Sequence, residues 1–206
     1  PPSVAGVRTL LPGTGMFSPH VELAITTMLE AHGLGRRKAG RGFEATHALS
    51  VAMIVGDFGF AEHAIVAAIL HDSLEDTTLE RDVIRHRFGE QVLAIVSDVT
   101  EPPKTVPWRT RKETYIEHLR HSPRDEARAV ASADKIHNLS NLITGLEQQG
   151  VALADAFTSD IDGMIWYHQQ VHEMLVDTWA HPILDEHGRR LDRFLAAARA
   201  ASSPGQ

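Results

Sequence analysis

The sequence predicts an all-α fold, an irregular multi-helix bundle, from three observations. Apolar residues recur at helical spacing, and the segment 61–71 is apolar on nearly all sides, which is typical of a buried helix. The sequence lacks the apolar-polar alternation of strands, and it shows no repeats or heptads. Short breaks with glycine or proline separate the helical segments, which favours direct helix-on-helix connections.

Local signals predict where the helices begin and end. Ser18 and Pro19 form an N-cap and first-turn pair that opens a helix ending at about His32. Thr77 and Glu80 have the spacing of a capping box, so a helix is expected from there to about residue 89. The other expected helices span about residues 43–55, 61–71, 91–99, 110–121, 124–145, 153–177 and 182–200, and the tail from residue 202 is expected to fray.

The length of 206 residues suits one domain with a substantial core. We expect a single domain over residues 1–206, with a core at about 18–178 and a C-terminal helix at about 182–200. Segment 101–107 carries three prolines and is expected to be a loop. It is not interpreted as a domain boundary, because neither half of the chain holds a complete set of candidate site residues.

Composition excludes several classes of function. The net charge of −7 argues against a nucleic-acid partner, which requires a basic surface. The absence of cysteine excludes disulfides, cysteine-bound zinc and thiol nucleophiles. The first fifteen residues do not resemble a signal peptide, and no apolar run is long enough to cross a bilayer, so we expect a cytoplasmic protein without a membrane partner. No pattern specifies an oligomeric state.

A cluster of ionisable residues ends the apolar segment 61–71. His71 and Asp72 are followed at helical spacing by Glu75 and Asp76. Charges at the edge of a core must be paired or bound to a ligand. One imidazole and three carboxylates are sufficient for a metal site with an acid or base beside it.

Three further residues fit the same site. His47 lies in an otherwise apolar helical segment, and Asp134 follows small apolar residues, with Asn138 one helical turn later on the same face. A mixed set of imidazole and carboxylate ligands suits Mn²⁺, Fe²⁺ or Zn²⁺ better than Ca²⁺. Each residue alone is a weak signal, and the prediction depends on their order along the chain.

That order, His, then His-Asp, then Asp, resembles the signature of the HD superfamily of phosphohydrolases. Segment 68–77, AILHDSLEDT, is similar to "LLHDxxEDT" of the Rel/Spo hydrolase domains and their small stand-alone relatives. Segment 31–40, AHGLGRRKAG, resembles their "AHxGQxRKxG". Segments 88–92 and 96–100 look like "FGxxV…VxxVT", and 133–139, ADKIHNL, resembles "ADKxxNL".

The resemblance implies a helical bundle of the HD-domain type and a metal-dependent enzyme. Its substrate would be guanosine 3′,5′-bis(diphosphate), ppGpp, an alarmone from which the family removes pyrophosphate at the 3′ position. The metal would be Mn²⁺, although other divalent first-row metals also suit such ligands. The residues implied to bind it are His47, His71, Asp72 and Asp134.

The resemblance also implies roles for residues around the metal. Glu75 and Asp76 would orient and deprotonate the attacking water. Arg37 and Lys38 would contact the nucleotide, and Asn138 would hydrogen-bond near the ribose. Independently of the resemblance, a basic, glycine-rich segment over residues 33–42 of an acidic protein suits an anionic small molecule.

Two alternatives stay open at this point. The segment around His47 lacks the family's Pro and Tyr, and Asn141 stands where a Thr is expected. These departures favour an HD phosphohydrolase for another nucleotide, a nucleotidase or a dinucleotide-phosphate phosphatase. The other alternative is a nucleotide-binding module without turnover, against which the intact Glu75 and Asp76 argue.

Four other residues are assigned lesser roles. His168 and His172 are four apart and could bind a second metal, but we interpret them as surface residues or as support for the substrate pocket. His137 is expected to point away from the face of Asp134. Tyr167 is expected in the core, with substrate contact as a minor alternative.

Overall fold

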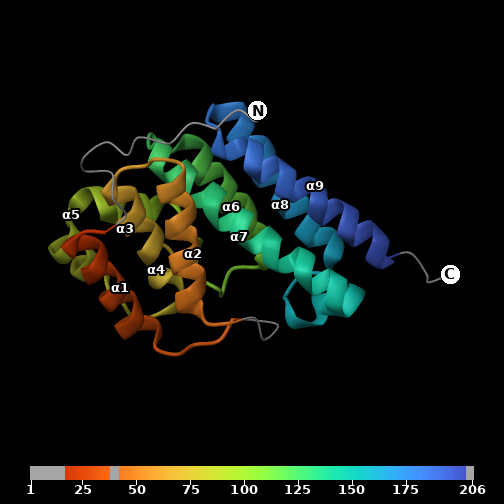
Figure 1. The fold of residues 1–206 in the computed structure, drawn as a ribbon, viewed down its shortest axis with the longest axis horizontal. Coiled ribbons are helices and arrows are strands. Elements are labelled where there is room, and N and C mark those ends of the chain that lie inside the picture. Colours follow the sequence, from red (N-terminus) through yellow and green to blue (C-terminus); the bar gives the residue numbers. More distant parts are fainter. Residues whose placement is uncertain (1–16, 38–41, 203–206) are drawn as a thin grey trace, which may run out of the picture.

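The computed structural model describes residues 17–37 and 42–202, and it confirms the all-α prediction (Figure 1). Apart from an isolated bridge between Arg36 and Phe43, these residues form no β-structure. The helices are α1 (Pro19–His32), α2 (Glu44–Asp57), α3 (Glu62–Leu70), α4 (Ser73–Asp76), α5 (Arg81–Asp98), α6 (Trp108–His121), α7 (Asp125–Gln149), the 3₁₀ helix η2 (Gly150–Ala156), α8 (Ile161–Thr178) and α9 (Ile183–Ser202).

The start of α1 follows the predicted capping signal. The Ser18 hydroxyl accepts a hydrogen bond from the backbone N–H of Val21 at 3.1 Å, and Pro19 occupies the first turn. The helix ends at Gly33, whose φ of 56° lies in the left-handed region that glycine adopts without strain. The predicted fraying of the tail concerns residues that are mostly outside the described part of the chain.

The predicted capping box at Thr77 and Glu80 is wrong. The Thr77 hydroxyl accepts from the backbone N–H of Leu79 in a local turn, and α5 begins only at Arg81. The two helices expected on either side of residue 89 are parts of α5. They meet at Gly89, where φ 86° and ψ 171° interrupt the helical backbone.

A second correction concerns the helix expected from Leu153. Residues Gly150–Ala156 form η2, and α8 begins at Ile161 after the Asp160 carboxylate accepts from the N–H of Gly163 at 2.8 Å. In the same region α7 continues to Gln149, beyond the predicted end at Gly145. The interrupted stretch allows the chain to turn between two long helices.

Two groups of buried apolar side chains surround α7. The larger includes most of α3, where seven consecutive residues from Ala64 to Leu70 are buried. The smaller lies at the C-terminal half of α7 and is formed with η2, α8 and α9. Both groups include residues of α7 and α8, so these helices connect them. In Figure 1, α8 and α9 run along one side of α7, and α1 to α5 lie at its other side.

None of the helices in the described part of the chain combines the length and the apolar character needed to span a lipid bilayer.

Candidate active site

Four of the predicted site residues come from three parts of the fold. His47 lies on α2, His71 and Asp72 lie at the junction of α3 and α4, and Asp134 lies near the middle of α7. The buried, apolar α3 ends at Leu70, so His71, the first polar side chain after the helix, lies at the edge of the core. His47 and His71 are 2% and 4% exposed, which makes them costly to bury without partners.

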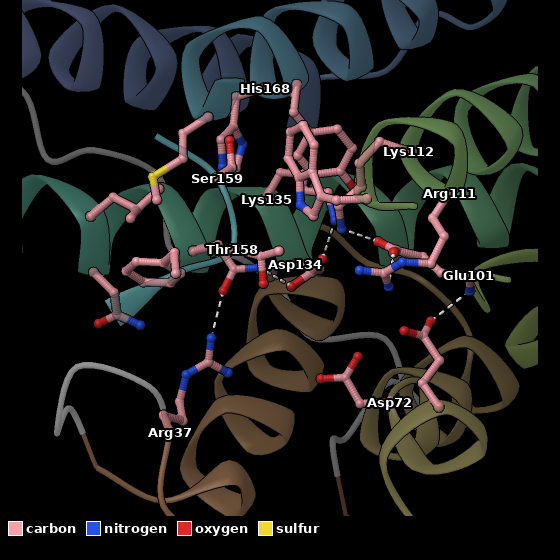
Figure 2. A pocket seen from close by; sticks show the side chains of 18 of the residues that line it. Arg37, Asp72, Glu101, Arg111, Lys112, Asp134, Lys135, Thr158, Ser159 and His168 are labelled. Atoms are coloured by element: carbon pink, nitrogen blue, oxygen red, sulfur yellow. Dashed lines mark hydrogen bonds and ion pairs between the residues drawn. The ribbon is translucent and has the colours of Figure 1, made fainter. Parts of the chain in front are cut away.

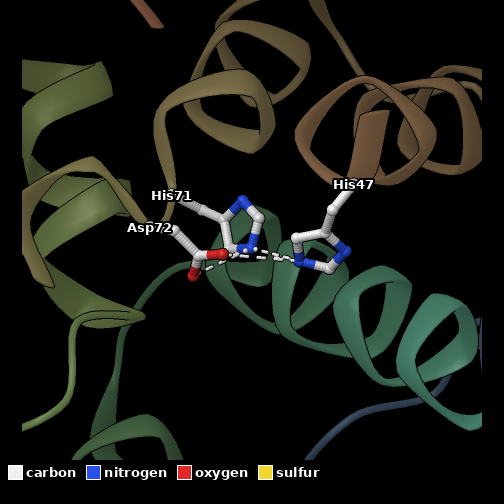
Figure 3. A group of neighbouring side chains, drawn as sticks. All are labelled: His47, His71 and Asp72. Carbon is white, nitrogen blue, oxygen red and sulfur yellow. Dashed lines mark hydrogen bonds and ion pairs between the residues drawn. The ribbon is translucent and has the colours of Figure 1, made fainter. Parts of the chain in front are cut away.

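The side chains of His47, His71 and Asp72 form a compact cluster (Figure 3). The two Nε2 atoms are 3.2 Å apart. Asp72 Oδ1 lies 3.1 Å from His71 Nε2, and Asp72 Oδ2 lies 3.4 Å from His47 Nε2. One ligand atom from each residue lies within 4.8 Å of the others. This donor set fits a divalent first-row metal ion.

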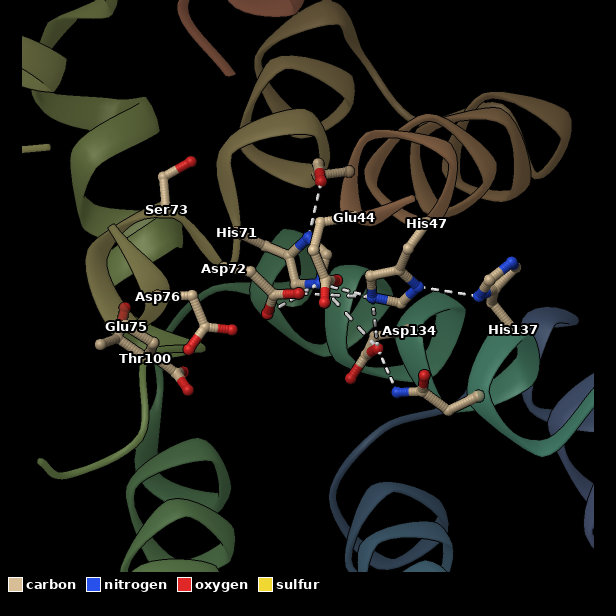
Figure 4. Close-up of polar contacts among 12 residues, drawn as sticks. Glu44, His47, His71, Asp72, Ser73, Glu75, Asp76, Thr100, Asp134 and His137 are labelled. Carbon is tan, nitrogen blue, oxygen red and sulfur yellow. Dashed lines mark hydrogen bonds and ion pairs between the residues drawn. The ribbon is translucent and has the colours of Figure 1, made fainter. Parts of the chain in front are cut away.

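Asp134 faces the same cluster from α7 (Figure 4). Its Oδ1 lies 3.2 Å from His47 Nε2 and 3.9 Å from His71 Nε2. The same oxygen accepts a hydrogen bond from Asn138 Nδ2 at 2.5 Å, and Oδ2 accepts from Lys135 Nζ at 2.5 Å. The fold therefore brings all four predicted metal ligands together, with one Asp134 oxygen directed at the histidines.

Hydrogen bonds on the outer side of the imidazoles orient them toward the cluster. His71 Nδ1 lies 2.8 Å from the carbonyl oxygen of Ala68, so Nδ1 donates and Nε2 is left as a lone-pair donor to a metal. His47 Nδ1 lies 2.8 Å from His137 Nδ1. The expectation that His137 points away was wrong. Its place three residues after Asp134 on a helix was a usable signal, because such residues are neighbours.

The charges in the cluster shift each other's pKa. Burial lowers the pKa of His47, but hydrogen bonds to Asp134 and Asp72 more than offset this and raise it above the ordinary value. Burial raises the pKa of Asp72, but the nearby His71 and His47 hold it well below the usual range. For Asp134, the charge of Lys135 is the main effect that outweighs burial and keeps the pKa low. Both carboxylates therefore stay ionised, as metal ligands must.

Glu75 and Asp76 lie on α4, directly after the cluster. Glu75 Oε1 accepts a hydrogen bond from the backbone N–H of Glu101 at 2.6 Å. Burial, followed by the negative charge of Asp72, raises the pKa of Glu75 to about 8. Asp76 is more exposed and forms an ion pair with Lys104. The two predicted catalytic carboxyls thus differ in environment, and Glu75, the less exposed one, is poised to exchange a proton near neutral pH.

A cavity of about 320 Å³ opens above the cluster (Figure 2). Its walls include His47, Asp72 and Asp134 together with both carboxyls of α4. On one side, Arg37 donates from Nη2 to Asn138 Oδ1 at 2.7 Å, so two of the predicted substrate-binding residues are in contact. The third, Lys38, lies outside the described residues.

Two cationic residues of the cavity wall, Arg111 and Lys112, were not predicted from the sequence. Arg111 and Lys112 on α6 face the cavity across from Arg37, as Figure 2 shows. Tyr167 and His168 on α8 line it as well, and both are buried. Burial lowers the pKa of His168 to about 3, so this residue is a neutral part of the cavity wall. The interpretation of His168 as surface decoration is wrong, whereas that of pocket support is compatible with its position.

Comparison with protein families gives one assignment. A family model described as the HD domain matches residues 24–160, which cover more than half of the chain. The match includes all four candidate metal ligands, Glu75 and Asp76.

Several curated proteins are similar in sequence. A guanosine-3′,5′-bis(diphosphate) 3′-pyrophosphohydrolase of Aquifex aeolicus is 31% identical over 149 residues, which are 72% of this chain and 21% of that protein. The enzyme of the same name called MESH1 is 40% identical over 98 residues in Xenopus tropicalis, 47% of this chain and 54% of that protein. In Homo sapiens it is 37% identical over 114 residues, 54% of this chain and 63% of that protein. The chain thus spans between a fifth and two thirds of these relatives.

Two solved structures share the fold. The protein lmo0812 from Listeria monocytogenes matches with a TM-score of 0.65 and 33% identity, covering 71% of this chain and 96% of that one. A metazoan ortholog of SpoT, described as hydrolysing ppGpp, matches with a TM-score of 0.70 and 23% identity. That match covers 87% of this chain and 95% of the other, and it supports the fold alone.

Proposed function

Because this chain belongs to the HD domain family, we propose that it is a metal-dependent phosphohydrolase that removes pyrophosphate from the 3′ position of ppGpp. The observation that carries the proposal is the His47, His71 and Asp72 cluster, which lies at a cavity lined by carboxyls and by cationic side chains. The relatives named as ppGpp 3′-pyrophosphohydrolases support the choice of substrate. The cytoplasmic location and the lack of nucleic-acid or membrane partners stay predictions from the sequence.

The proposed metal is Mn²⁺, held by His47, His71, Asp72 and Asp134. Two imidazoles and two carboxylates suit this ion, and both histidines present Nε2 while Nδ1 is used elsewhere. When bound, the ion supplies a more acidic water molecule and stabilises charge that develops on phosphorus.

The protein's own side chains supply the proton transfer and the orientation of the substrate. Glu75 takes a proton from the attacking water, and the N–H of Glu101 holds its carboxyl in place. Asp76, paired with Lys104, orients the same water. Arg37 and Asn138 hold the nucleoside end of the substrate. The guanidinium of Arg37 faces either the base or a phosphate group. Water attack then yields guanosine 5′-diphosphate and pyrophosphate.

Metal-free protein incubated with ppGpp tests this function. Separation of the nucleotides by ion exchange should show guanosine 5′-diphosphate and pyrophosphate only after Mn²⁺ is added. Asp134→Ala should lose both metal and activity. Glu75→Gln should keep the metal and lower kcat by roughly 100-fold or more, because a positioned base contributes at least that much. A fully active Glu75→Gln would disprove its role.

An HD phosphohydrolase for another nucleotide is the second candidate, and one residue favours it. Asn141, which departs from the family's pattern, lines the cavity and lies 3.3 Å from His137 Nδ1 through its Nδ2. If the protein binds Mn²⁺ but leaves ppGpp intact, this candidate replaces the first. A panel of nucleoside phosphates and dinucleotide phosphates then identifies the substrate.

A further inference from the structure

The cavity wall formed by α6 and α8 holds more positive than negative charge. Arg111 Nη1 lies 3.0 Å from Glu101 Oε2, and Lys112 Nζ is paired with the other oxygen of the same carboxylate. All three side chains are at least 85% buried, with exposures of 13%, 15% and 9%. Two buried cations therefore share one carboxylate, which leaves an uncompensated charge that an anion would neutralise.

The same wall presents polar atoms that lack partners. Among the described residues, Arg111 Nε, Tyr167 Oη and His168 Nδ1 are buried without a hydrogen-bond partner, and all three residues line the cavity. A guanidinium N–H and a phenol O–H donate, and the neutral imidazole of His168 also donates when its proton is on Nδ1. Buried donors of this kind require an acceptor, which a ligand in the cavity would supply.

The position of the wall relates it to the proposed reaction. Glu101, which holds both cations, donates its backbone N–H to Glu75. Lys112 Nζ also lies 4.5 Å from the centre of the Tyr167 ring. Lys112 therefore contacts Tyr167 on one side and, through Glu101, is connected to Glu75. Phosphate oxygens are the acceptors that suit a cluster of cations and N–H or O–H donors.

We propose that Arg111, Lys112 and Tyr167 bind the phosphate groups of the nucleotide that do not react, the 5′-diphosphate. This inference rests on the proposed function and names the residues that select a nucleotide with phosphates at two positions. A nucleotide that carries the 3′-diphosphate alone leaves the wall's charge and donors unsatisfied, and is bound less well.

Binding of the unreactive product end tests the inference without any turnover. Calorimetric titration of the metal-free full chain compares guanosine 5′-diphosphate with guanosine, which lacks the phosphates. The wild type should bind the diphosphate roughly tenfold or more tightly, since hydrogen bonds to charged groups contribute that much. Lys112→Met and Tyr167→Phe should reduce or abolish this difference and leave the affinity for guanosine unchanged.

Tyr167→Phe guards against misfolding, because it removes only an oxygen atom that has no partner in the fold. Tyr115→Phe is the matched control, since Tyr115 is equally buried beside Tyr167 but does not line this cavity. It should bind both ligands as the wild type does. Equal binding of the two ligands by the wild type, or unchanged diphosphate binding by Lys112→Met and Tyr167→Phe, would overturn the inference. Release of pyrophosphate from ppGpp, measured on the Mn²⁺-loaded preparations, reports separately on the proposed function.

Discussion

At the scale of single residues, the carboxyl group of Glu75 is kept protonated at neutral pH by the metal-free fold. Burial and the charge of Asp72 raise its pKa to about 8. A cation bound to His47, His71 and Asp72 would lower this pKa, because it favours the ionised form nearby. We therefore expect metal binding and ionisation of Glu75 to occur together.

The pKa of Glu75 predicts how the stability of the metal-free protein depends on pH. The folded-state value of about 8 lies above the ordinary 4.5, so the stabilising contribution is complete below pH 4.5 and is lost as the pH rises through 8. Relative to Glu75→Gln, the wild type's free energy of unfolding should fall by a few kcal/mol over this range. Urea denaturation at several pH values measures the free energy of unfolding of both proteins. If this free energy depends on pH in the same way in the wild type and in Glu75→Gln, the raised pKa of Glu75 is refuted.

A second residue-scale prediction concerns the partner of His47. Burial lowers the pKa of His137 to about 4, so a neutral His137 accepts the proton that His47 Nδ1 carries when Nε2 binds metal. His137→Ala should weaken Mn²⁺ binding by roughly 10-fold to 100-fold, as loss of such outer contacts does. Metal titration followed by calorimetry measures this. His172→Ala, which changes a histidine away from the cluster, should bind as the wild type.

The candidate metal ligands were predictable from the sequence, whereas their surroundings were not. The ligands are recognisable because His71 and Asp72 end an apolar helix and because Asp134 follows small residues. The contact between His137 and His47 depends on how α7 packs against α2, which no local pattern specifies. The wall at Arg111 and Lys112 was missed because its charges resemble those of an ordinary exposed helix face.

At the scale of elements, the fold departs from prediction where local hydrogen bonds compete. The helix α3 was predicted correctly because a segment that is apolar on all sides is expected to form a buried helix. The start of α5 was placed too early because Thr77 uses its hydroxyl in a turn. The segment η2 was predicted as α-helix because the spacing of its apolar residues fits both an α-helix and a 3₁₀ helix.

Gly89 gives a prediction for α5. Its φ of 86° and ψ of 171° lie in a region that side chains with a Cβ avoid, although the space around it is open. Gly89→Ala should lower the free energy of unfolding by roughly 1–3 kcal/mol through backbone strain alone. Urea denaturation measures the change, and the exposed neighbour Gln91→Ala should have almost no effect. Equal stability of Gly89→Ala and the wild type would show that the backbone relaxes there.

At the scale of the whole molecule, the candidate metal site connects α2, the α3–α4 junction and α7. An ion held by all of them binds only when these elements are packed together, so it stabilises the folded state. That residues 1–206 form a single domain stays a prediction, which the sharing of α7 and α8 between both apolar groups supports.

Metal should therefore raise the stability of the chain by a calculable amount. At a free Mn²⁺ concentration 100 times its Kd, the free energy of unfolding should increase by about 2.7 kcal/mol. Thermal unfolding with Mn²⁺ and with chelator measures the difference. His71→Ala should abolish the increase, and an unchanged response in that variant would place the ion elsewhere.

The contacts of Asn138 have a consequence for how the two ligands act on each other. Its oxygen accepts from Arg37 at the nucleotide end, and its nitrogen donates to Asp134 at the metal end. A nucleotide that draws Arg37 away changes the environment of a metal ligand through a single amide group. Thermodynamic linkage is reciprocal, so whatever factor the nucleotide applies to the affinity for the ion, the ion applies to the affinity for the nucleotide. Asn138→Leu removes both hydrogen bonds, so it should reduce the cooperativity between the nucleotide and the ion.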